Sequence, residues 1–468
     1  MSDQKCIFQS SKQSFRGEVI TPAHAGYDDV RALYNGLIDK RPEAIVQCLD
    51  ANDVVGALGW AQESALPVAV RGGGHNGAGL GSVDGGLVVD LSRMKEVSVD
   101  PTARRVSVSP GCTQAEVDAA TYAHGLAVPA GIVSSTGIAG LTLGGGHGYL
   151  SRQHGLTVDS LHEAEVVLAD GRKIVANARQ NEDLFWGLRG GGGNFGVVTR
   201  FTFHAHPIAT VYGGPIFWEL EHTRAVLEFY RDYLPTAPRR LCPFFGVKRI
   251  PCAPPFPEAL WGRPVCAIIS CYDGPASDGE RAVDVIRKAL PPPLLDAMQQ
   301  MPFPALQGLF DPLLPKGLGW YWKGDFVKEL TDRAIDVHVE HAARLPPGPS
   351  LMHLYPVDGA VHDVPSDATA FGCRDARWSM VIAGITPVLE ESAIATQWAK
   401  DYFAALHPMN PGGGYVNFMM ADEGRERVRA AYGQNYERLT RIKAKYDPRN
   451  FFRVNQNVLP AATRDASL

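Results

Sequence analysis

Glycine is concentrated in three stretches of the first 200 residues, and these stretches limit what the chain can fold into. They read GGGHNGAGLGSVDGG over residues 72–86, GIAGLTLGGGHG over 137–148 and GLRGGGGNFG over 187–196. Because glycine has no Cβ and tolerates positive φ, its backbone amides can approach and surround an anion. Three such stretches predict a site for a large phosphate-bearing cofactor, with tight turns as the alternative for any one of them.

A dinucleotide-binding fingerprint is the first form of such a site to test. Gly191, Gly193 and Gly196 satisfy the GxGxxG spacing. The fingerprint must follow a strand and open a helix that points at the pyrophosphate. Here the preceding DLFWGLR is typical of a helix and the following VVTRFTF of a strand. This order disfavours a nicotinamide-binding Rossmann domain.

Composition excludes several classes of function. The chain has 468 residues, a formal net charge of −5 and no run of about 18 apolar residues, so we expect small-molecule partners and no nucleic acid or membrane. The oligomeric state is left open. We expect reduced thiols and a cytoplasmic protein, because no CxxC pair occurs among the eight cysteines, which are Cys6, Cys48, Cys112, Cys242, Cys252, Cys266, Cys271 and Cys373. No metal site is predicted, and HVEH (338–341) is interpreted as a solvated helix face.

The pattern of apolar residues divides the chain into three regions. Up to about residue 205, runs such as AIVQCL, PVAVRG and GVVTRFTF predict strands that alternate with helices, including one that begins after Thr113 with Glu116 three residues on and stops at Gly125. Residues 206–410 contain proline clusters, strand-like runs such as PVCAIISCYDG and amphipathic helices, which indicate a second domain. Residues 411–468 contain YVNFMM, one long charged helical pattern and the tail PRNFFRVNQN. We predict a two-lobed α+β fold.

Four motifs in this order resemble a known family. RGGGHNGAG, GIAGLTLGGGHGYLSRQHGL, DLFWGLRGGGGNFGVVT and YDPRNFFRVNQN are similar to the FAD-linked oxidases of the berberine bridge enzyme type, within the vanillyl-alcohol oxidase superfamily with its PCMH-type FAD-binding domain. The overall pattern is nearest to bacterial members of the 6-hydroxy-D-nicotine oxidase type. The resemblance implies an FAD-binding domain at 1–205, with its motif-bearing part at about 40–205. It also implies a substrate-binding domain at 206–410, with an antiparallel sheet backed by helices, and a C-terminal segment, 411–468, that closes onto the FAD domain.

The resemblance also implies how FAD is held. The histidine of the RGGGHN loop is attached covalently to the flavin in this family, which makes His75 the expected anchor. Many relatives carry a second link through a cysteine, but the corresponding position here is Val133, so a single attachment is expected. The expected cofactor-binding residues are Arg71, Gly72, Gly73, Gly74, His75, Asn76, Gly77, Gly131, Ser135, Thr136, Gly137, Gly140, Gly144, Gly145, Gly146, Gly148, Gly193, Asn194, Phe195, Gly196, Val198, Asn455 and Gln456.

Candidate catalytic residues lie in the segment Tyr415-Val416-Asn417-Phe418. Plant relatives carry Y-x-N-Y here, and the last tyrosine acts as a base. Phe418 has no such hydroxyl, so the candidates are Tyr415 and Asn417, which share a face if the segment is a strand. An amine that is uncharged when bound can lose hydride without a base, which favours amine substrates. Ordinary strand packing is the alternative role for both residues.

The substrate site is expected among aromatic residues of the second domain. Trp320, Trp322 and Lys323 lie in GWYWKGDF, and His353 and Tyr355 share one face of the strand LMHLYPV. Aromatic walls with a few polar tips suit a flat organic substrate, although the same residues could simply fill the core of a sheet. Cys373 and Arg374 receive no role from the sequence.

These observations predict an FAD-dependent oxidase. It takes hydride from a small amine or alcohol to flavin N5, and O2 then reoxidises the flavin and gives H2O2. The alternatives within the family are an oligosaccharide or alcohol oxidase and a dehydrogenase or cyclising enzyme. An alternative of another class is a flavin-bearing protein that binds a metabolite without turnover.

Overall fold

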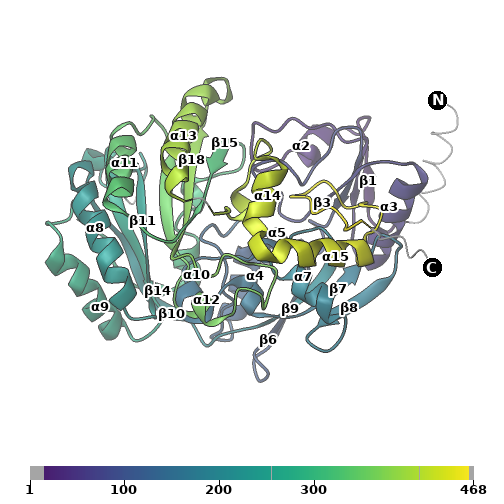
Figure 1. The fold of residues 1–468 in the computed structure, drawn as a ribbon, viewed down its shortest axis with the longest axis horizontal. Helices are drawn as coiled ribbons and strands as arrows, with labels where there is room; N and C mark the ends of the chain where they lie inside the picture. Colours follow the sequence, from purple (N-terminus) through teal and green to yellow (C-terminus); the bar gives the residue numbers. More distant parts are fainter. Residues whose placement is uncertain (1–14, 255, 411, 463–468) are drawn as a thin grey trace.

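The computed structural model describes residues 15–254, 256–410 and 412–462. Three sheets and the helices around them form two lobes that lie side by side, with the C-terminal helices crossing the lobe that contains the N-terminal part of the chain (Figure 1). The predicted α+β class is confirmed. No helix in these ranges is long and apolar enough to cross a membrane.

The first lobe contains two sheets. Their strands are β1 (Glu18–Ile20), β2 (Ala44–Gln47), β3 (Val68–Arg71), β4 (Leu87–Asp90), β5 (Val97–Asp100), β6 (Arg105–Val108), β7 (Leu161–Val167), β8 (Lys173–Asn177) and β9 (Val197–His204). One sheet has the order β1-β2-β4-β3, in which β2, β4 and β3 are parallel and β1 is antiparallel. The other is antiparallel with the order β5-β6-β9-β7-β8. The apolar runs that predicted strands here are confirmed.

The second lobe is built on one antiparallel sheet. Its strands are β10 (Thr210–Glu219), β11 (Leu241–Arg249), β12 (Pro264–Tyr272), β13 (Leu295–Asp296), β14 (Gln299–Pro302), β15 (Gly319–Lys323), β16 (Phe326–Val327), β17 (Leu351–Pro356) and β18 (Trp378–Thr386). The order is β13-β10-β12-β11-β17-β18-β15, with β14 paired to β10 and β16 to β18. The helices α8 (Thr223–Tyr233), α9 (Ala276–Ala289), α11 (Asp332–Ala343) and α13 (Ser392–Leu406) cover its outer face (Figure 1). The opposite face of the sheet is therefore turned toward the first lobe.

Other helices complete the two lobes. They are α2 (Tyr27–Arg31), α3 (Ala51–Glu63), α4 (Gln114–Tyr122), α5 (Ile138–Gly144), α6 (Ser151–His154), α7 (Glu182–Leu188), α10 (Phe303–Gln307) and α12 (Ala360–Asp363). The predicted start of α4 is confirmed, because Thr113 and Glu116 form a reciprocal capping box. The helix ends at Tyr122, three residues before Gly125, which has a φ of +68°.

The C-terminal region differs from its prediction as one long helix. It forms α14 (Gly424–Tyr432) and α15 (Tyr436–Tyr446), separated at Gly433, whose φ of +51° is a conformation that glycine adopts readily. Side chains from both helices, among them Val428 and Leu439, share a core with the five-stranded sheet. Phe452, in the tail, is buried against the four-stranded sheet. The C-terminal region therefore packs as part of the first lobe.

The structure answers one question that the sequence left open and corrects one local expectation. YVNFMM is not a strand, because Val416–Phe418 forms a 3₁₀ turn. HVEH is not a solvated face: His338 is buried and lies 2.6 Å from the Tyr402 hydroxyl, and His341 stacks on the Tyr402 ring. Cys6 lies outside the described residues, and all seven described cysteines are free.

Candidate functional site

The first and second glycine stretches lie against each other, backbone to backbone. A Cβ built on Gly73 would lie 2.5 Å from the Gly137 nitrogen, and one built on Gly137 would lie 2.4 Å from the Gly73 nitrogen. No side chain fits into such a contact. The pair fixes the loop after β3 against the start of α5. Both glycines line a cavity between the lobes.

His75 lies in this loop and lines the cavity. Its ring stacks on Tyr34, with the ring centroids 3.7 Å apart, and its Nε2 lies 3.0 Å from Ser135 Oγ. Burial lowers the pKa of His75 to about 3, so the imidazole is neutral at physiological pH. A neutral imidazole carries a lone pair on one nitrogen, as a nucleophile requires.

Most of the expected cofactor-binding residues line the same cavity. They are Arg71, Gly72, Gly73, Gly74, His75, Asn76, Gly131, Thr136, Gly137, Gly140, Gly193, Asn194, Gly196, Val198, Asn455 and Gln456. Val133, at the position of the second link in relatives, also lines the cavity, and none of the described residues that line it is a cysteine. Ser135 lines a neighbouring hollow that shares His75.

Two features of the cavity suit an FAD molecule. A Cβ on Gly140 or on Gly193 would meet no atom within 4 Å, so bare backbone faces open space inside the cavity. Asn455 Oδ1 is buried there without a hydrogen-bond partner, and a ribityl hydroxyl could supply one. We call Gly72–Gly74, Gly137, Gly140 and Gly193 the glycine floor.

Other glycines expected to touch the cofactor are packed closely against neighbouring residues on the side where a Cβ would lie. A Cβ on Gly77 would lie 2.4 Å from the Trp322 ring, and one on Gly144 would lie 2.3 Å from Asn417 Oδ1. A Cβ on Gly146 would lie 2.2 Å from Thr157 Oγ1. Gly145 approaches Phe371 and Gly148 approaches the Ala130 carbonyl in the same way, and Phe195 is buried in the core of the first lobe. None of Gly77, Gly144, Gly145, Gly146, Gly148 and Phe195 is among the described residues that line the cavity, and their expected contact with the cofactor stays a prediction.

Tyr415 and Asn417 meet at the end of α5, although their segment is not a strand. The Tyr415 hydroxyl accepts hydrogen bonds from the Gly146 N–H at 2.8 Å and from Asn417 Nδ2 at 2.9 Å. Asn417 Nδ2 also approaches the Gly140 and Leu141 carbonyls. Burial raises the pKa of Tyr415 to about 12, against the opposing effect of these two hydrogen bonds, so the phenol stays protonated at neutral pH.

The sheet of the second lobe and the turn at Phe418 supply an aromatic wall, which we define as Trp320, Trp322, Tyr355 and Phe418. All four residues line the cavity. Tyr355 OH lies 2.6 Å from His353 Nδ1, and His353 also lines the cavity. The expected pairing of His353 and Tyr355 on one face of β17 is therefore seen. The indole nitrogens of Trp320 and Trp322 are buried without partners.

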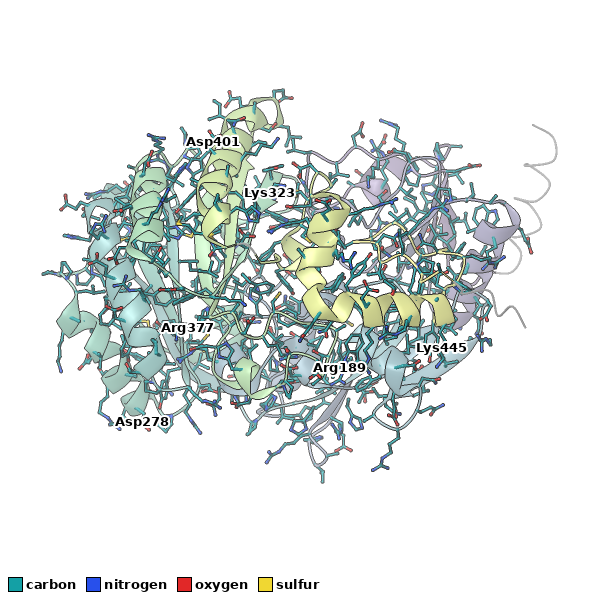
Figure 2. The ribbon with its side chains drawn as sticks, in the orientation of Figure 1. Arg189, Asp278, Lys323, Arg377, Asp401 and Lys445 are labelled. Carbon is teal, nitrogen blue, oxygen red and sulfur yellow. The ribbon has the colours of Figure 1, made fainter. Side chains whose placement is uncertain are left out.

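Lys323 does not reach the cavity, and its expected role as a substrate residue is corrected. Alternation along β15 places its side chain opposite Trp320 and Trp322. Its Nζ lies 2.9 Å from Asp422 and 2.9 Å from Glu423, directly before α14. Figure 2 shows Lys323 between α13 and α14. Lys323 links β15 to the C-terminal region instead.

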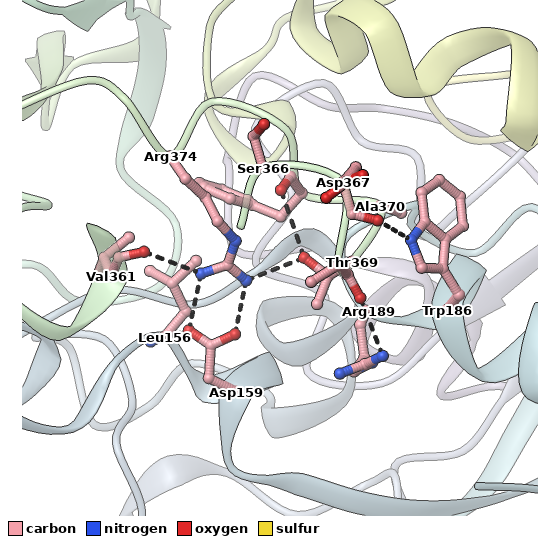
Figure 3. Close-up of polar contacts among 12 residues, drawn as sticks. Leu156, Asp159, Trp186, Arg189, Val361, Ser366, Asp367, Thr369, Ala370 and Arg374 are labelled. Atoms are coloured by element: carbon pink, nitrogen blue, oxygen red, sulfur yellow. Dashed lines mark hydrogen bonds and ion pairs between the residues drawn. The ribbon is translucent and has the colours of Figure 1, made fainter. Parts of the chain in front are cut away.

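Arg374, which received no role from the sequence, fixes the loop of residues 366–374 (Figure 3). Its guanidinium donates to both carboxylate oxygens of Asp159, at 3.0 and 2.6 Å, and to Thr369 Oγ1 at 2.9 Å. Trp186 Nε1 donates to the Asp367 carbonyl of the same loop. The loop thereby holds Phe371 in a core cluster with Tyr415.

Sequence reasoning missed three residues around the cavity. His147 lines it, and neither of its buried ring nitrogens has a partner. Asn35 joins the two lobes, because its Nδ2 donates to the Gly77 carbonyl at 2.8 Å and to the Trp320 carbonyl at 2.9 Å. Lys443 Nζ donates to the carbonyls of Asn194 and Phe452, which ties the tail to the third glycine stretch. The GGGH motif was the one available signal for His147.

Comparison with known proteins gives matches at both ends of the chain and along its whole length. The FAD binding domain family matches residues 42–177, and the berberine and berberine like family matches residues 414–459. An FAD-linked oxidoreductase of Dictyostelium discoideum is 31% identical over 469 residues, covering 98% of this chain and 99% of that protein.

Two solved structures share the fold over nearly the whole length of this chain. 6-Hydroxy-D-nicotine oxidase from Arthrobacter nicotinovorans has a TM-score of 0.85 and 25% identity, covering 95% of this chain and 98% of its own. Glucooligosaccharide oxidase from Acremonium strictum, described with a 6-S-cysteinyl, 8α-N1-histidyl FAD, has a TM-score of 0.83 and 24% identity, covering 98% of each chain.

Proposed function

Because the chain belongs to the berberine bridge enzyme-like family of FAD-linked oxidoreductases, we propose that it oxidises a small uncharged amine or alcohol. The observation that carries this proposal is a single cavity shared by three sets of residues. It is lined by the glycine floor, by Tyr415 and Asn417, and by the aromatic wall. A cofactor held on the floor and a flat substrate held on the wall would meet in front of Tyr415.

We propose that FAD is attached through His75 alone. The neutral, stacked imidazole and the absence of a cysteine from the described cavity lining support a single bond. The 8α-N1-histidyl FAD of the glucooligosaccharide oxidase is a precedent for a histidine link. In this proposal, bound FAD would supply the hydride acceptor, and O2 would be the final electron acceptor, giving H2O2. Arg71, Asn76, Asn194, Asn455 and Gln456 would hold the cofactor beside the glycine floor.

The residues of this chain have defined tasks in such a reaction. Trp320, Trp322 and Tyr355 hold a flat substrate and exclude water. Tyr415, protonated and held by two donors, positions the substrate through its remaining hydroxyl proton, and Asn417 fixes that geometry. A protonated phenol cannot accept a substrate proton at neutral pH. We therefore infer that an amine loses hydride as its free base, without a protein base.

The roles of the three regions of the chain follow from the same proposal. We assign FAD binding to residues 1–205, substrate binding to 206–410 and closure of the FAD site to 411–468. The two N-terminal sheets, the nine-stranded sheet and the packing of α14 and α15 support these limits. The seven free described cysteines support a reducing compartment, and we propose the cytoplasm.

An aerobic peroxide-release screen over amines, alcohols and sugars tests the reaction. We expect peroxide with an amine or alcohol, and bleaching of the flavin by the same compound without oxygen. Fast flavin bleaching with slow peroxide release and fast dye reduction would identify a dehydrogenase or cyclising enzyme. Turnover of sugars alone would identify an oligosaccharide oxidase. Binding without bleaching for every compound would contradict an enzymatic function and favour a metabolite-binding flavoprotein.

A further inference from the structure

His147 lies in the cavity with its hydrogen-bonding capacity unused. The residue is 6% exposed, and both Nδ1 and Nε2 are buried without a partner. Its ring centroid lies 4.8 Å from that of Tyr415, 5.1 Å from Tyr355 and 5.7 Å from Phe418. Burial lowers the pKa of His147 to about 3, which keeps the ring neutral with one donor and one acceptor.

The backbone before His147 places this ring in the cavity. Gly145 and Gly146 have φ values of +130° and +77°, which residues with a side chain rarely adopt. The Gly146 N–H is held by the Tyr415 hydroxyl, and the Gly146 carbonyl accepts from the Thr157 N–H at 2.9 Å. The ring is therefore fixed beside the rings of Tyr415 and Tyr355.

An unpartnered buried imidazole costs free energy that a bound ligand can recover. A polar group removed from water without a hydrogen bond destabilises the site until a partner arrives. The unpartnered indole nitrogens of Trp320 and Trp322 can only donate. His147 can both donate and accept, so it complements a hydroxyl group or an uncharged ring nitrogen.

The charge of the cavity limits the ligand further. Among the described residues that line it, none is Asp, Glu or Lys. Arg71, at the end of the glycine floor, is already paired with Asp90 at 2.8 Å. An ammonium or carboxylate group beside His147 would lose its hydration without gaining a counterion.

We propose that His147 is the substrate-recognition residue of this cavity and selects an uncharged, flat molecule with a hydroxyl or ring-nitrogen group. The inference rests on the proposed function, because it names the ligand class of the same site. Molecules of this shape without such a group leave the imidazole unpaired and bind weakly.

Phenol and toluene form a matched pair of probes, because they differ by a hydroxyl in place of a methyl group. Their dissociation constants, measured by ligand-observed NMR on the flavin-bearing protein, report binding without turnover. Benzoate and phenyltrimethylammonium test the charge. We expect phenol to bind at least about tenfold more tightly than toluene, and both ions at least about tenfold more weakly than phenol.

His147→Phe keeps a flat ring and removes both nitrogens, so toluene should then bind at least as tightly as phenol. His147→Asn restores a donor and an acceptor and should keep a preference for phenol. An unchanged preference in His147→Phe would overturn the proposal. If that variant does not fold, the wild-type measurements still test the proposal. Equal binding of phenol and toluene, or tight binding of either ion, would overturn the proposal. Failure of the peroxide screen would leave this preference intact, which separates the two proposals.

Discussion

The glycine floor and the aromatic wall face one cavity but use different parts of the residue to build it. The floor depends on absent side chains, since Gly73 and Gly137 touch through their backbones. The wall depends on large side chains from β15, β17 and the turn at Phe418. The loop that carries Gly72–Gly74 meets the wall at Gly77, which leaves space for the Trp322 ring. A change on the floor should therefore affect folding or cofactor binding, and a change on the wall should affect substrate binding.

The largest effect is expected at the support beneath the floor. Lys443 is fully buried and donates at 2.7 Å to Asp447 and to the Asn194 carbonyl beside Gly193. Lys443→Met leaves Asp447 as an uncompensated buried charge, so we expect a loss of ~3–5 kcal/mol in the free energy of unfolding and a loss of bound flavin. Chemical denaturation and the visible absorbance of the purified protein measure both.

Lys445 is the matched control for this change. Its Nζ also lies 2.7 Å from a carboxylate, that of Asp183, but its side chain is 59% exposed at the end of α15 (Figure 2). Lys445→Met should alter stability by ~0–1 kcal/mol. Equal losses in the two variants would show that burial of the Lys443 pair is not what holds the tail.

The second prediction compares two positions on the floor itself. Gly73→Ala places a methyl group against backbone that cannot move aside, so the variant should lose ~1–3 kcal/mol or more and its flavin. Gly140 lies in α5 with open space at its Cβ position, so Gly140→Ala should keep the fold and gain up to ~1 kcal/mol. Its methyl group would occupy the space assigned to FAD, and we expect at least about tenfold weaker flavin binding. Normal flavin content in Gly140→Ala would contradict the placement of the cofactor.

Several parts of this comparison could be predicted from the sequence. Local apolar patterns were enough to predict the strands up to residue 204. The four motifs were enough to predict that the glycine loops form a cofactor site. Tyr415 and Asn417 were found as a pair although their backbone is a 3₁₀ turn, because two residues of separation bring side chains close in either conformation.

Other residues could not be found in this way. The partners of Asn35 and Lys443 lie 285 and 249 positions away, at Trp320 and Asn194, and no local pattern reports such contacts. Gly77 and Gly144 were assigned to the cofactor because the sequence does not reveal which neighbour fills the space of a missing Cβ. His147 was missed for the same reason, because its motif was interpreted only through the backbone of its glycines.

The third prediction concerns the contact between the lobes. Burial raises the pKa of Asp118 to about 7, where α4 meets α10 and Gln307 Nε2 lies 3.4 Å from its carboxylate. The stabilising effect of the protonated form is complete below the unfolded pKa of 3.8 and is lost as pH rises through about 7. Asp118→Asn should therefore raise stability at pH 8 by on the order of 2 kcal/mol and change it little at pH 4. Thermal unfolding at the two pH values measures this, and an equal effect at both would refute it.

The smallest effect is expected for the reaction rate at Tyr415. Tyr415→Phe removes the acceptor of the Gly146 N–H, so it should cost ~1–3 kcal/mol of stability. Flavin reduction by a saturating amine, followed without oxygen, should slow by less than about tenfold, because the protonated phenol is not a base. A loss of about 10² to 10⁴ would instead assign Tyr415 as the base.

The proposed covalent bond between FAD and His75 would join the floor to the cofactor, and its location tests the account most directly. Protein precipitated with acid should stay yellow, and peptide mass spectrometry should find the flavin only on the peptide that contains His75. His75→Ala should release its flavin on precipitation, because the glycine floor alone holds it without a bond. Complete release of the colour from the wild-type protein, or a flavin on any other residue, would contradict the account.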